Sequence, residues 1–246
     1  MESLTRFTML PTPCPYLRDR EWRLEYEIAV NIEPGDLLER LKEGWRRHSY
    51  YFFRPACLSC QACQTLRIPV QEFKPNRSQR RVIKTNANTE YVIRSPVFTQ
   101  RHVEIFMSCQ SHHYRTRDWP EESLESSTAT VRSFVEDPVP IQEWDFYIDD
   151  TLVGVMYVDR LPHGFSAIYS YHDPAYRKYS IGTLMILSLL EYARMQGFSH
   201  VYLGYYIKDC LSMQYKSNFA PNEILTPDGT WRPLIEQGSR QSDHDP

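Results

Sequence analysis

Three cysteines at regular spacing are the first residues whose types and positions suggest chemistry. Cys57, Cys60 and Cys63 lie in the stretch CLSCQAC, three residues apart. Thiolates at such spacing bind zinc or an iron–sulfur cluster, and both kinds of site usually take four protein ligands. The C-x2-C-x2-C pattern is ferredoxin-like, whereas zinc sites more often use two separate C-x2-C pairs. The alternative to a metal is a cluster of reduced thiols packed in a tight loop.

The stretch RKYSIG, residues 177–182, opens a segment that is typical of a helix. Ser180 and Gly182 are small enough for a ligand to approach the backbone, and the free N–H groups at a helix start bind anions. The pattern is similar to the pyrophosphate-binding loop of GNAT acyltransferases, with Ser180 in the position of the first glycine. The alternative is a core helix that Ser180 merely caps.

A basic stretch, FKPNRSQRRVIK, occupies residues 73–84 and has only Glu72 close by as an acid. Its cations are Lys74, Arg77, Arg80, Arg81 and Lys84. Such a strip can contact a phosphate backbone, and the contact would be sensitive to salt. The alternative is a solvated basic loop without a partner.

Residues 203–225 combine aromatic side chains with lysines after a predicted strand. The residues that would crowd this end of a sheet are Tyr205, Tyr206, Lys208, Tyr215 and Lys216. Cations beside aromatic rings suit a carboxylate or the end of a nucleic acid, whereas the alternative is an aromatic core with surface lysines. Candidate bases elsewhere are His112, His113 and His172. Adjacent histidines on a helix face different directions, which argues against a metal shared by the first two.

Composition limits the class of protein. The chain has 246 residues, of which 41% are hydrophobic and 24% charged, so it is globular and forms one large domain or two small ones. The first 100 residues carry 16 Lys and Arg against 11 Asp and Glu, and the remainder carries 12 against 20. This basic front permits a polyanionic partner. Six cysteines are too few for a disulfide scaffold of this size.

Other classes of protein are disfavoured by what the sequence lacks. The N-terminus has no basic segment followed by an apolar run, and no window approaches about 18 apolar residues, so we expect no signal peptide, no membrane span and a cytoplasmic location. GxGxxG and GxxxxGK[ST] motifs are absent, as are GxSxG and HExxH, which disfavours nucleotide hydrolysis and the common hydrolase mechanisms.

Hydrophobic periodicity predicts the elements that must position these residues. Strands are expected at 19–30, on both sides of the cysteine loop and at 90–96, with helices at 33–48 and from 99 into an acidic loop that ends near 127. Three strands at 143–174 then precede the helix at 177–197 and a strand at 200–207. Hairpins followed by a helix and a strand indicate an α+β fold with a mainly antiparallel, acyltransferase-like sheet. We place a domain boundary near residue 97, which separates a smaller N-terminal α/β domain with the cysteine cluster (1–97) from a GNAT-like domain (98–236) and a polar tail (237–246).

Five stretches in order resemble one family. They are CPYLRDREWRLEYEI, GWRRHSYYFFRPACLSCQACQTLRIPV, FKPNRSQRRV, IYSYHDPAYRKYSIGTLMI and VYLGYYIKDCLSMQYKSNFAPNEIL. From about residue 10 to residue 236 the chain is similar to the bacterial aspartate/glutamate leucyltransferases, which are relatives of the eukaryotic arginyl-tRNA–protein transferases. The resemblance implies a tRNA-dependent aminoacyltransferase with a GNAT-like C-terminal domain. Such an enzyme moves leucine from leucyl-tRNA to the α-amino group of proteins that begin with Asp or Glu, and so marks them for degradation through the N-degron route.

The implied reaction needs no ATP and no cofactor for the transfer itself. An α-amino group has an ordinary pKa of about 7.7–8.0, so positioning the neutral amine against the ester supplies much of the rate. The expected partners are leucyl-tRNA and acceptor proteins, without a membrane or DNA, and the expected state is a monomer. The alternatives are the same reaction with arginyl-tRNA as donor, an acetyl-CoA-dependent GNAT acetyltransferase and a noncatalytic RNA-binding module.

On this hypothesis the singled-out residues receive roles. The expected catalytic residues are Tyr169, Ser170, Tyr171, Lys208 and Tyr215. The expected substrate-binding residues are Arg177, Ser180, Gly182, Tyr205, Lys208, Met213, Lys216 and Phe219. Within that set, Lys208, Lys216 or Arg177 would pair with the acidic side chain of the acceptor, and Met213 and Phe219 would form a slot for leucine.

The remaining roles fall to the N-terminal half. Lys74, Arg77, Arg80, Arg81 and Lys84 would bind tRNA. Because the related transferases carry a cysteine-rich N-terminal region, Cys14 becomes the candidate fourth ligand beside Cys57, Cys60 and Cys63, for zinc or an iron–sulfur cluster. The lone Cys109 and Cys210 are expected to be buried or incidental thiols.

Overall fold

A computed structural model describes residues 1–117 and 123–234, so the polar tail at 237–246 and part of the predicted acidic loop lie outside the described residues. The helices are α1 (Pro34–Lys42), α2 (Arg77–Thr85), α3 (Gln100–Arg117), α4 (Leu124–Val135) and α5 (Ile181–Met195), with short 3-10 helices η1 (Pro174–Tyr179) and η2 (Gln214–Asn218). The strands are β1 (Glu2–Thr8), β2 (Thr12–Pro13), β3 (Glu21–Trp22), β4 (Leu24–Val30), β5 (Arg46–His48), β6 (Tyr51–Pro55), β7 (Gln64–Pro69), β8 (Glu90–Arg94), β9 (Gln142–Ile148), β10 (Thr151–Leu161), β11 (Gly164–His172), β12 (His200–Tyr206), β13 (Glu223–Leu225) and β14 (Trp231–Pro233).

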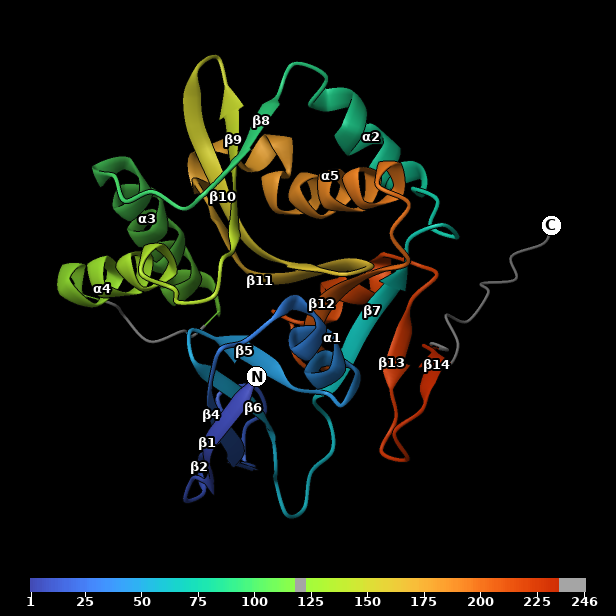
Figure 1. Ribbon diagram of the computed structural model, residues 1–246. Coiled ribbons are helices and arrows are strands. Elements are labelled where there is room, and N and C mark those ends of the chain that lie inside the picture. The colour runs from blue at the N-terminus through green and yellow to red at the C-terminus, as the bar shows by residue number, and fades with distance from the viewer. Residues whose placement is uncertain (118–122, 235–246) are drawn as a thin grey trace.

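An eight-stranded sheet in the order β14-β13-β7-β12-β11-β10-β9-β8 forms the centre of the molecule (Figure 1). Neighbouring strands pair antiparallel except β11 and β12, which are parallel. The predicted α+β fold with a mainly antiparallel sheet is thereby confirmed. In the described part of the chain, no helix is both long and apolar enough to cross a membrane.

Strand β10 is apolar almost throughout because both of its faces are covered. Val153, Met156 and Val158 pack into the core that α5 shares, whereas Val155 and Tyr157 pack into the core formed with α3 and α4. In Figure 1 the two sets of helices accordingly lie on opposite faces of this sheet. Such two-sided burial explains why the strand reads as an apolar run without strict alternation.

The parallel pair β11–β12 is short, and this shapes the site described below. Only Gly164–Ser166 pair with His200–Tyr202, after which the two strands separate. A register shift between Tyr202 and Gly204 in the β12–β7 pair accompanies the separation, and Gly204 has a φ of +78°. The sheet therefore opens between β11 and β12 on the side where α5 begins.

Replacing Gly164 with alanine is expected to weaken the closed end of this opening. A Cβ atom at residue 164 would lie 2.2 Å from the carbonyl oxygen of His200, so the paired backbones would have to move apart. We expect a loss of about 1–3 kcal/mol in the free energy of unfolding, measured by urea denaturation. Alanine at Gly35, where the added Cβ meets nothing within 4 Å, is the matched control and should change stability little. Equal stability of both variants would contradict the tight pairing.

The smaller sheet, in the order β1-β4-β6-β5, packs against the large one. Its core contains Leu37 and Leu41 of α1 together with Leu161 and Tyr202 of the large sheet. Strands β7 and β8 precede the boundary predicted near residue 97, yet they pair with β12 and β9 beyond it. The division into domains stays a prediction, and the sheet itself is continuous across it.

Three local predictions differ from the structure. The helix expected at 33–48 ends at Lys42, since Gly44 has a φ of +85° and residues 46–48 form β5. The basic stretch forms α2, because Asn76 and Gln79 make a reciprocal capping box at its start. A helix not predicted, α4, begins at Leu124 with Ser123 as its N-cap.

Candidate functional site

A cavity of about 740 Å³ lies where β11 and β12 separate. Eight of the residues predicted for the site line it: Tyr169, Ser170, Ser180, Gly182, Tyr205, Met213, Tyr215 and Lys216. They come from β11, the start of α5, the end of β12 and the η2 region, so sequence stretches far apart in the chain meet at one opening. The geometry brings together most of the substrate-binding set expected from the sequence.

Four predicted residues lie outside the lining of this cavity. Tyr171 is buried in the core with α3 and α4, where its hydroxyl lies 3.2 Å from the hydroxyl of Tyr157. Phe219 is buried in the main core beneath α5. Lys208 and Arg177 are exposed. Tyr171 and Phe219 therefore do not line the cavity as expected, and the roles of Lys208 and Arg177 stay predictions.

Arg46 is a charged lining residue to which the sequence analysis gave no role. It extends from β5 into the opening, where NH1 lies 3.3 Å from Ser166 Oγ and NH2 donates to the carbonyl oxygen of Ala167 at 2.6 Å. A Cβ atom at Gly204 would lie 2.9 Å from Arg46 Cζ, so the glycine leaves room for the guanidinium. Burial lowers the pKa of Arg46. The only signal in the sequence is the doublet RR inside GWRRHSYY, which reads equally well as a helix end.

Lys216 is the second buried cation at the cavity. Its side chain comes from η2, and its ammonium donates to the carbonyl oxygen of Tyr205 at 2.6 Å. Burial, together with the positive charge of Arg46, lowers the pKa of Lys216 to about 7. The alternative of a surface lysine is therefore wrong for Lys216, which is an internal group that is only partly charged at neutral pH.

Helix α5 begins at the cavity wall. Ser180 adopts a left-handed conformation with a φ of +52°, and its side chain makes no cap hydrogen bond. The simple interpretation of Ser180 as a side-chain cap is therefore wrong. Gly182 and Thr183 of the first turn also line the cavity. The N–H of Thr183 donates to the carbonyl oxygen of Ser180 at 2.9 Å, and the N–H groups that precede it at the start of the helix favour an anion.

The predicted tRNA-binding cations lie together on and just before α2. Lys74, Arg77, Arg80, Arg81 and Lys84 are all exposed, whereas Gln79 on the opposite side is buried and donates to the carbonyl oxygen of Asn218. Helix α2 also contacts α5, the helix that begins at the cavity. The basic surface of α2 and the cavity are therefore both adjacent to α5.

The cysteine loop lies close to the same cavity. Burial and the nearby thiols of Cys14, Cys57 and Cys60 raise the pKa of Cys63 to about 12. The backbone N–H of Ala62 and the guanidinium of Arg20 lower the pKa of Cys60. Arg20 NH1 lies 3.1 Å from the sulfur of Cys60.

The link to the cavity runs through Tyr16, which lines it. Burial and the charges of Cys63, Cys210 and Cys14 raise the pKa of Tyr16 to about 12. The sulfurs lie farther apart than the ligands of a bound metal ion would. In residues 1–117 and 123–234, the only potential metal ligands that all lie within 4.8 Å of one another are those of His102, Glu143 and Asp145. Four thiols beside a cationic side chain still have the donor chemistry of a metal site.

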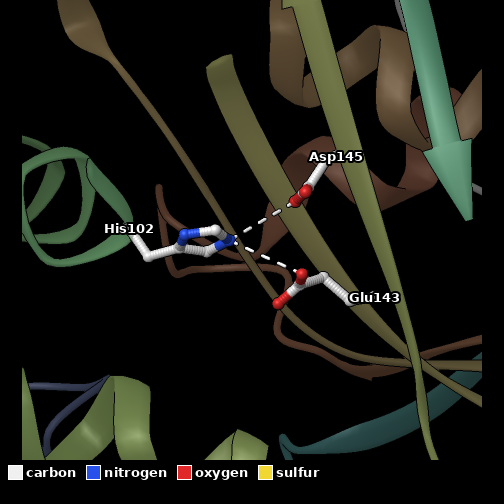
Figure 2. A group of neighbouring side chains, drawn as sticks. All are labelled: His102, Glu143 and Asp145. Carbon is white, nitrogen blue, oxygen red and sulfur yellow. Dashed lines mark ion pairs between the residues drawn. The ribbon is translucent and has the colours of Figure 1, made fainter. Parts of the chain in front are cut away.

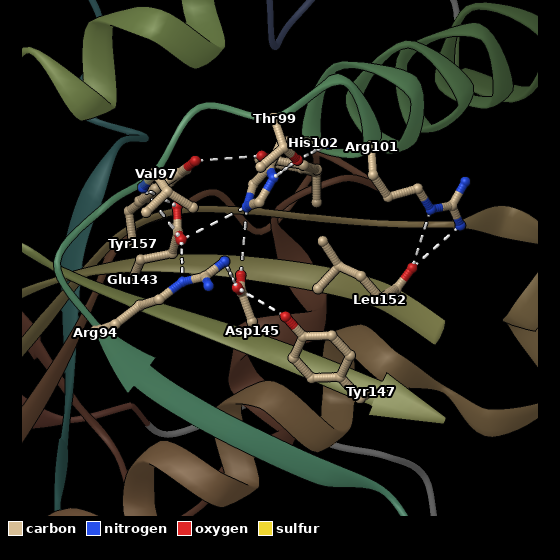
Figure 3. A network of polar contacts seen from close by, with 11 residues as sticks. Arg94, Val97, Thr99, Arg101, His102, Glu143, Asp145, Tyr147, Leu152 and Tyr157 are labelled. Carbon is tan, nitrogen blue, oxygen red and sulfur yellow. Dashed lines mark hydrogen bonds and ion pairs between the residues drawn. The ribbon is translucent and has the colours of Figure 1, made fainter. Parts of the chain in front are cut away.

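His102, Glu143 and Asp145 form a buried charge cluster at the β8–β9 edge of the large sheet (Figure 2). His102 Nε2 of α3 lies 3.5 Å from Glu143 Oε1 and from Asp145 Oδ1 of β9. Arg94 of β8 donates to Glu143 at 3.0 Å and also pairs with Asp145, and Tyr147 donates to Asp145 (Figure 3).

The charges in this cluster balance without a metal ion. Burial lowers the pKa of His102, but hydrogen bonds to Asp145 and Glu143 outweigh burial and raise it to about 9. At neutral pH an imidazolium and a guanidinium therefore face two carboxylates. The cluster joins β8, β9 and α3 through buried charge pairs.

Family models match both halves of the chain. The C-terminal model of arginine-tRNA-protein transferase covers residues 101–226, which contain most of the cavity wall, and the N-terminal model covers residues 12–81. The chain belongs to the arginine-tRNA-protein transferase family. The alignments with curated relatives cover most of this chain and most of each relative. An aspartate/glutamate leucyltransferase of Campylobacter jejuni is 36% identical over 220 residues, which cover 89% of this chain and 92% of the relative.

Other relatives carry the same name. One from Chromohalobacter salexigens is 37% identical over 241 residues and covers 94% of each chain. Among solved structures, L-PGS of Bacillus licheniformis shows a TM-score of 0.48 at 10% identity, with 71% of this chain and 59% of that chain covered. That likeness is too weak to carry an argument. The family assignment therefore rests on the sequence matches. Since the relatives are transferases, the chain is an enzyme of that class.

Proposed function

We propose that this enzyme transfers leucine from leucyl-tRNA to the α-amino group of proteins whose first residue is Asp or Glu. The observation that carries the proposal is the near full-length similarity to relatives named for that activity. The setting is the cytoplasm, where charged tRNA and nascent proteins are found. The split sheet supports the proposal because it offers one cavity that is open, partly apolar and cationic.

The reaction requires the neutral acceptor amine and the aminoacyl ester to meet in this cavity. The amine nitrogen attacks the ester carbonyl, a C–N bond forms, and the C–O bond to the ribose of the terminal adenosine breaks. The proton lost by the amine leaves with the ribose oxygen or water, so no oxidant or nucleotide is consumed. We assign the tetrahedral oxyanion to the first N–H groups of α5, next to Ser180 and Gly182. Met213 and its apolar neighbours form the wall for the leucine side chain.

The donor is distinguished by a transfer assay. A peptide that begins with Asp is incubated with the purified enzyme and with leucyl-tRNA, arginyl-tRNA or acetyl-CoA, each labelled. We expect a labelled peptide with leucyl-tRNA only. Product with arginyl-tRNA alone would identify arginyl-tRNA as the donor. Product with acetyl-CoA alone would identify the enzyme as an acetyltransferase. Binding of tRNA without any product would support the RNA-binding alternative.

The basic surface of α2 is proposed to bind the tRNA backbone. Replacing Arg77, Arg80 and Arg81 together with glutamine is expected to weaken tRNA binding and to reduce the slope of log K against log salt by about 2–3. Binding is measured by filter retention between low and physiological salt. The matched control replaces three exposed cations on other elements, Lys42, Arg132 and Arg232, with glutamine. Unchanged binding by the α2 variant would show that this surface is only solvated.

We further propose that Cys14, Cys57, Cys60 and Cys63 hold zinc or an iron–sulfur cluster that supports the loop next to Tyr16. When bound, the metal fixes the loop, and the transfer chemistry stays with the residues of the cavity. Anaerobically purified enzyme should contain about one metal site per chain, and the variant Cys60→Ser should lose the metal and unfold at a lower temperature. Cys109→Ser should retain the metal, since Cys109 is buried in the core formed by α3 and α4. Metal-free enzyme of unchanged thermal stability would contradict the proposal.

A further inference from the structure

Two buried cations line the cavity. Arg46 and Lys216 are each 8% exposed, and neither forms an ion pair with any residue in the described ranges. The carboxylate that raises the pKa of Arg46 is Asp159, which already pairs with the neighbouring Arg47 at 2.6 Å. A buried charge without a partner is costly, so proteins seldom keep one unless a ligand supplies the opposite charge.

The hydrogen-bond partners of both cations are neutral. Arg46 contacts the Ser166 hydroxyl and the Ala167 carbonyl, and Lys216 contacts the Tyr205 carbonyl and the sulfur of Met213. These partners fix the direction of the guanidinium and the ammonium without neutralising them. Each group retains N–H donors beyond those bonds, because Arg has five and Lys has three. Both side chains line the same cavity.

The two cations also influence each other. The charge of Arg46 contributes to the lowered pKa of Lys216, which places them within electrostatic reach inside one pocket. An anion bound between them would relieve this repulsion and would favour the charged form of Lys216. The pocket is therefore unfavourable when empty and favourable when it holds one negative group.

A carboxylate fits this position better than a phosphodiester does. Both cations line the cavity and are buried, so the group best able to reach them is one at the end of a short side chain. A backbone phosphate carries a ribose on each side and would have to enter with both. The exposed cations that suit a phosphate backbone lie instead on α2. A planar guanidinium also pairs with a carboxylate through two parallel hydrogen bonds.

We propose that Arg46 and Lys216 together bind the side-chain carboxylate of the acceptor protein's first residue. This assignment rests on the proposed transfer function and names the residues that select an acidic first residue. Arg46 supplies a fixed fork from β5, and Lys216 supplies an adjustable ammonium from η2. The α-amino group of the same residue then lies beside the start of α5, where the ester carbonyl is attacked.

The test compares peptides that differ only at the first residue. Transfer rates are measured for Asp and Asn peptides of otherwise identical sequence, with the native enzyme and with Lys216→Met and Arg46→Lys. We expect the native enzyme to prefer Asp strongly in kcat/KM. Lys216→Met should reduce this preference by about 10-fold or more, mainly through KM for the Asp peptide. Arg46→Lys keeps the charge but loses the fork, so it should reduce the preference to a smaller extent.

Controls separate this proposal from the others. Lys42→Met, an exposed lysine on α1, should keep the native preference, and circular dichroism reports whether each variant is folded. An unchanged Asp-to-Asn ratio in folded Lys216→Met and Arg46→Lys overturns the carboxylate assignment. Equal losses for both peptides together with weaker leucyl-tRNA binding would assign the two cations to a phosphate instead. If the native enzyme makes no product, the proposed function fails, and calorimetric binding of the Asp and Asn peptides without tRNA still tests the subsite.

Discussion

Replacing Asp145 with alanine is expected to lower the free energy of unfolding by about 3–5 kcal/mol, one of the largest losses available to a single substitution in this chain. Asp145 is fully buried and faces both Arg94 and His102. The variant leaves two cations opposite Glu143 alone, in a place that water does not reach. The penalty comes from the stranded charge more than from the lost contacts, and it is measured by urea denaturation at neutral pH.

The loss should depend on pH with a definite sign. The pKa of His102 is raised to about 9 in the folded protein against an ordinary 6.5, so its contribution to stability is complete below pH 6.5 and is lost as pH rises through 9. The charged groups that face His102 are Glu143 and Asp145, and Arg94 pairs with the same two carboxylates. The difference between native and Asp145→Ala should therefore be larger at pH 6 than at pH 10. Tyr147→Phe, which removes one hydrogen bond to Asp145, should cost only about 1 kcal/mol, and equal losses for both variants would contradict the charge argument.

Replacing Lys216 with methionine is expected to stabilise the fold while it impairs selection of the acceptor. The pKa of Lys216 is lowered to about 7 by burial and by Arg46, with Cys210 acting in the opposite direction. At or below pH 7 the folded protein bears the cost of a buried ammonium, and above about pH 10.5 the lysine is neutral in both states. The gain in the free energy of unfolding should therefore be largest near pH 6–7, about 2 kcal/mol or more, and should vanish by pH 10.5.

Denaturation curves at pH 6.5, 8.5 and 10.5 check this expectation. Lys208→Met, an exposed lysine eight positions earlier in the chain, is the matched control and should show no pH-dependent change. A Lys216→Met variant that is less stable than the native protein at pH 6.5 would mean that the lysine is retained for the fold. The expected gain instead identifies Lys216 as a residue kept for function at the expense of stability.

The elements that position the cavity could be predicted because their signals are local. The three strands with the DD turn, the following helix and the strand at residue 200 each have clear periodicity, and Asp149 and Asp150 both adopt the positive φ that this turn requires. Helix α2 was missed because its residues are mostly charged, so no apolar stripe marked it, whereas the Asn76–Gln79 capping box is visible in the letters.

The site was predictable only in part, since its chemistry depends on burial. Lys216 and Lys208 are both lysines in one polar stretch, and only the fold shows that one is internal and the other exposed. Arg46 lies 120 residues from Ser166, which it contacts, so no local pattern could join them. Tyr171 was grouped with Tyr169 and Ser170 because the three are neighbours on one strand, yet Tyr171 is buried in the core with α3 and α4, and only the fold shows this.

The proposed activity is tested most directly by the transfer of leucine to peptides whose first residue is Asp. Native enzyme is incubated with labelled leucyl-tRNA and two Asp-starting peptides, one with a free α-amino group and one with that group acetylated. Tandem mass spectrometry then locates the new residue. We expect a single leucine, joined by a peptide bond to the α-nitrogen of the free peptide, and no modification of the acetylated one. Leucine on a side chain, or equal labelling of both peptides, would contradict it.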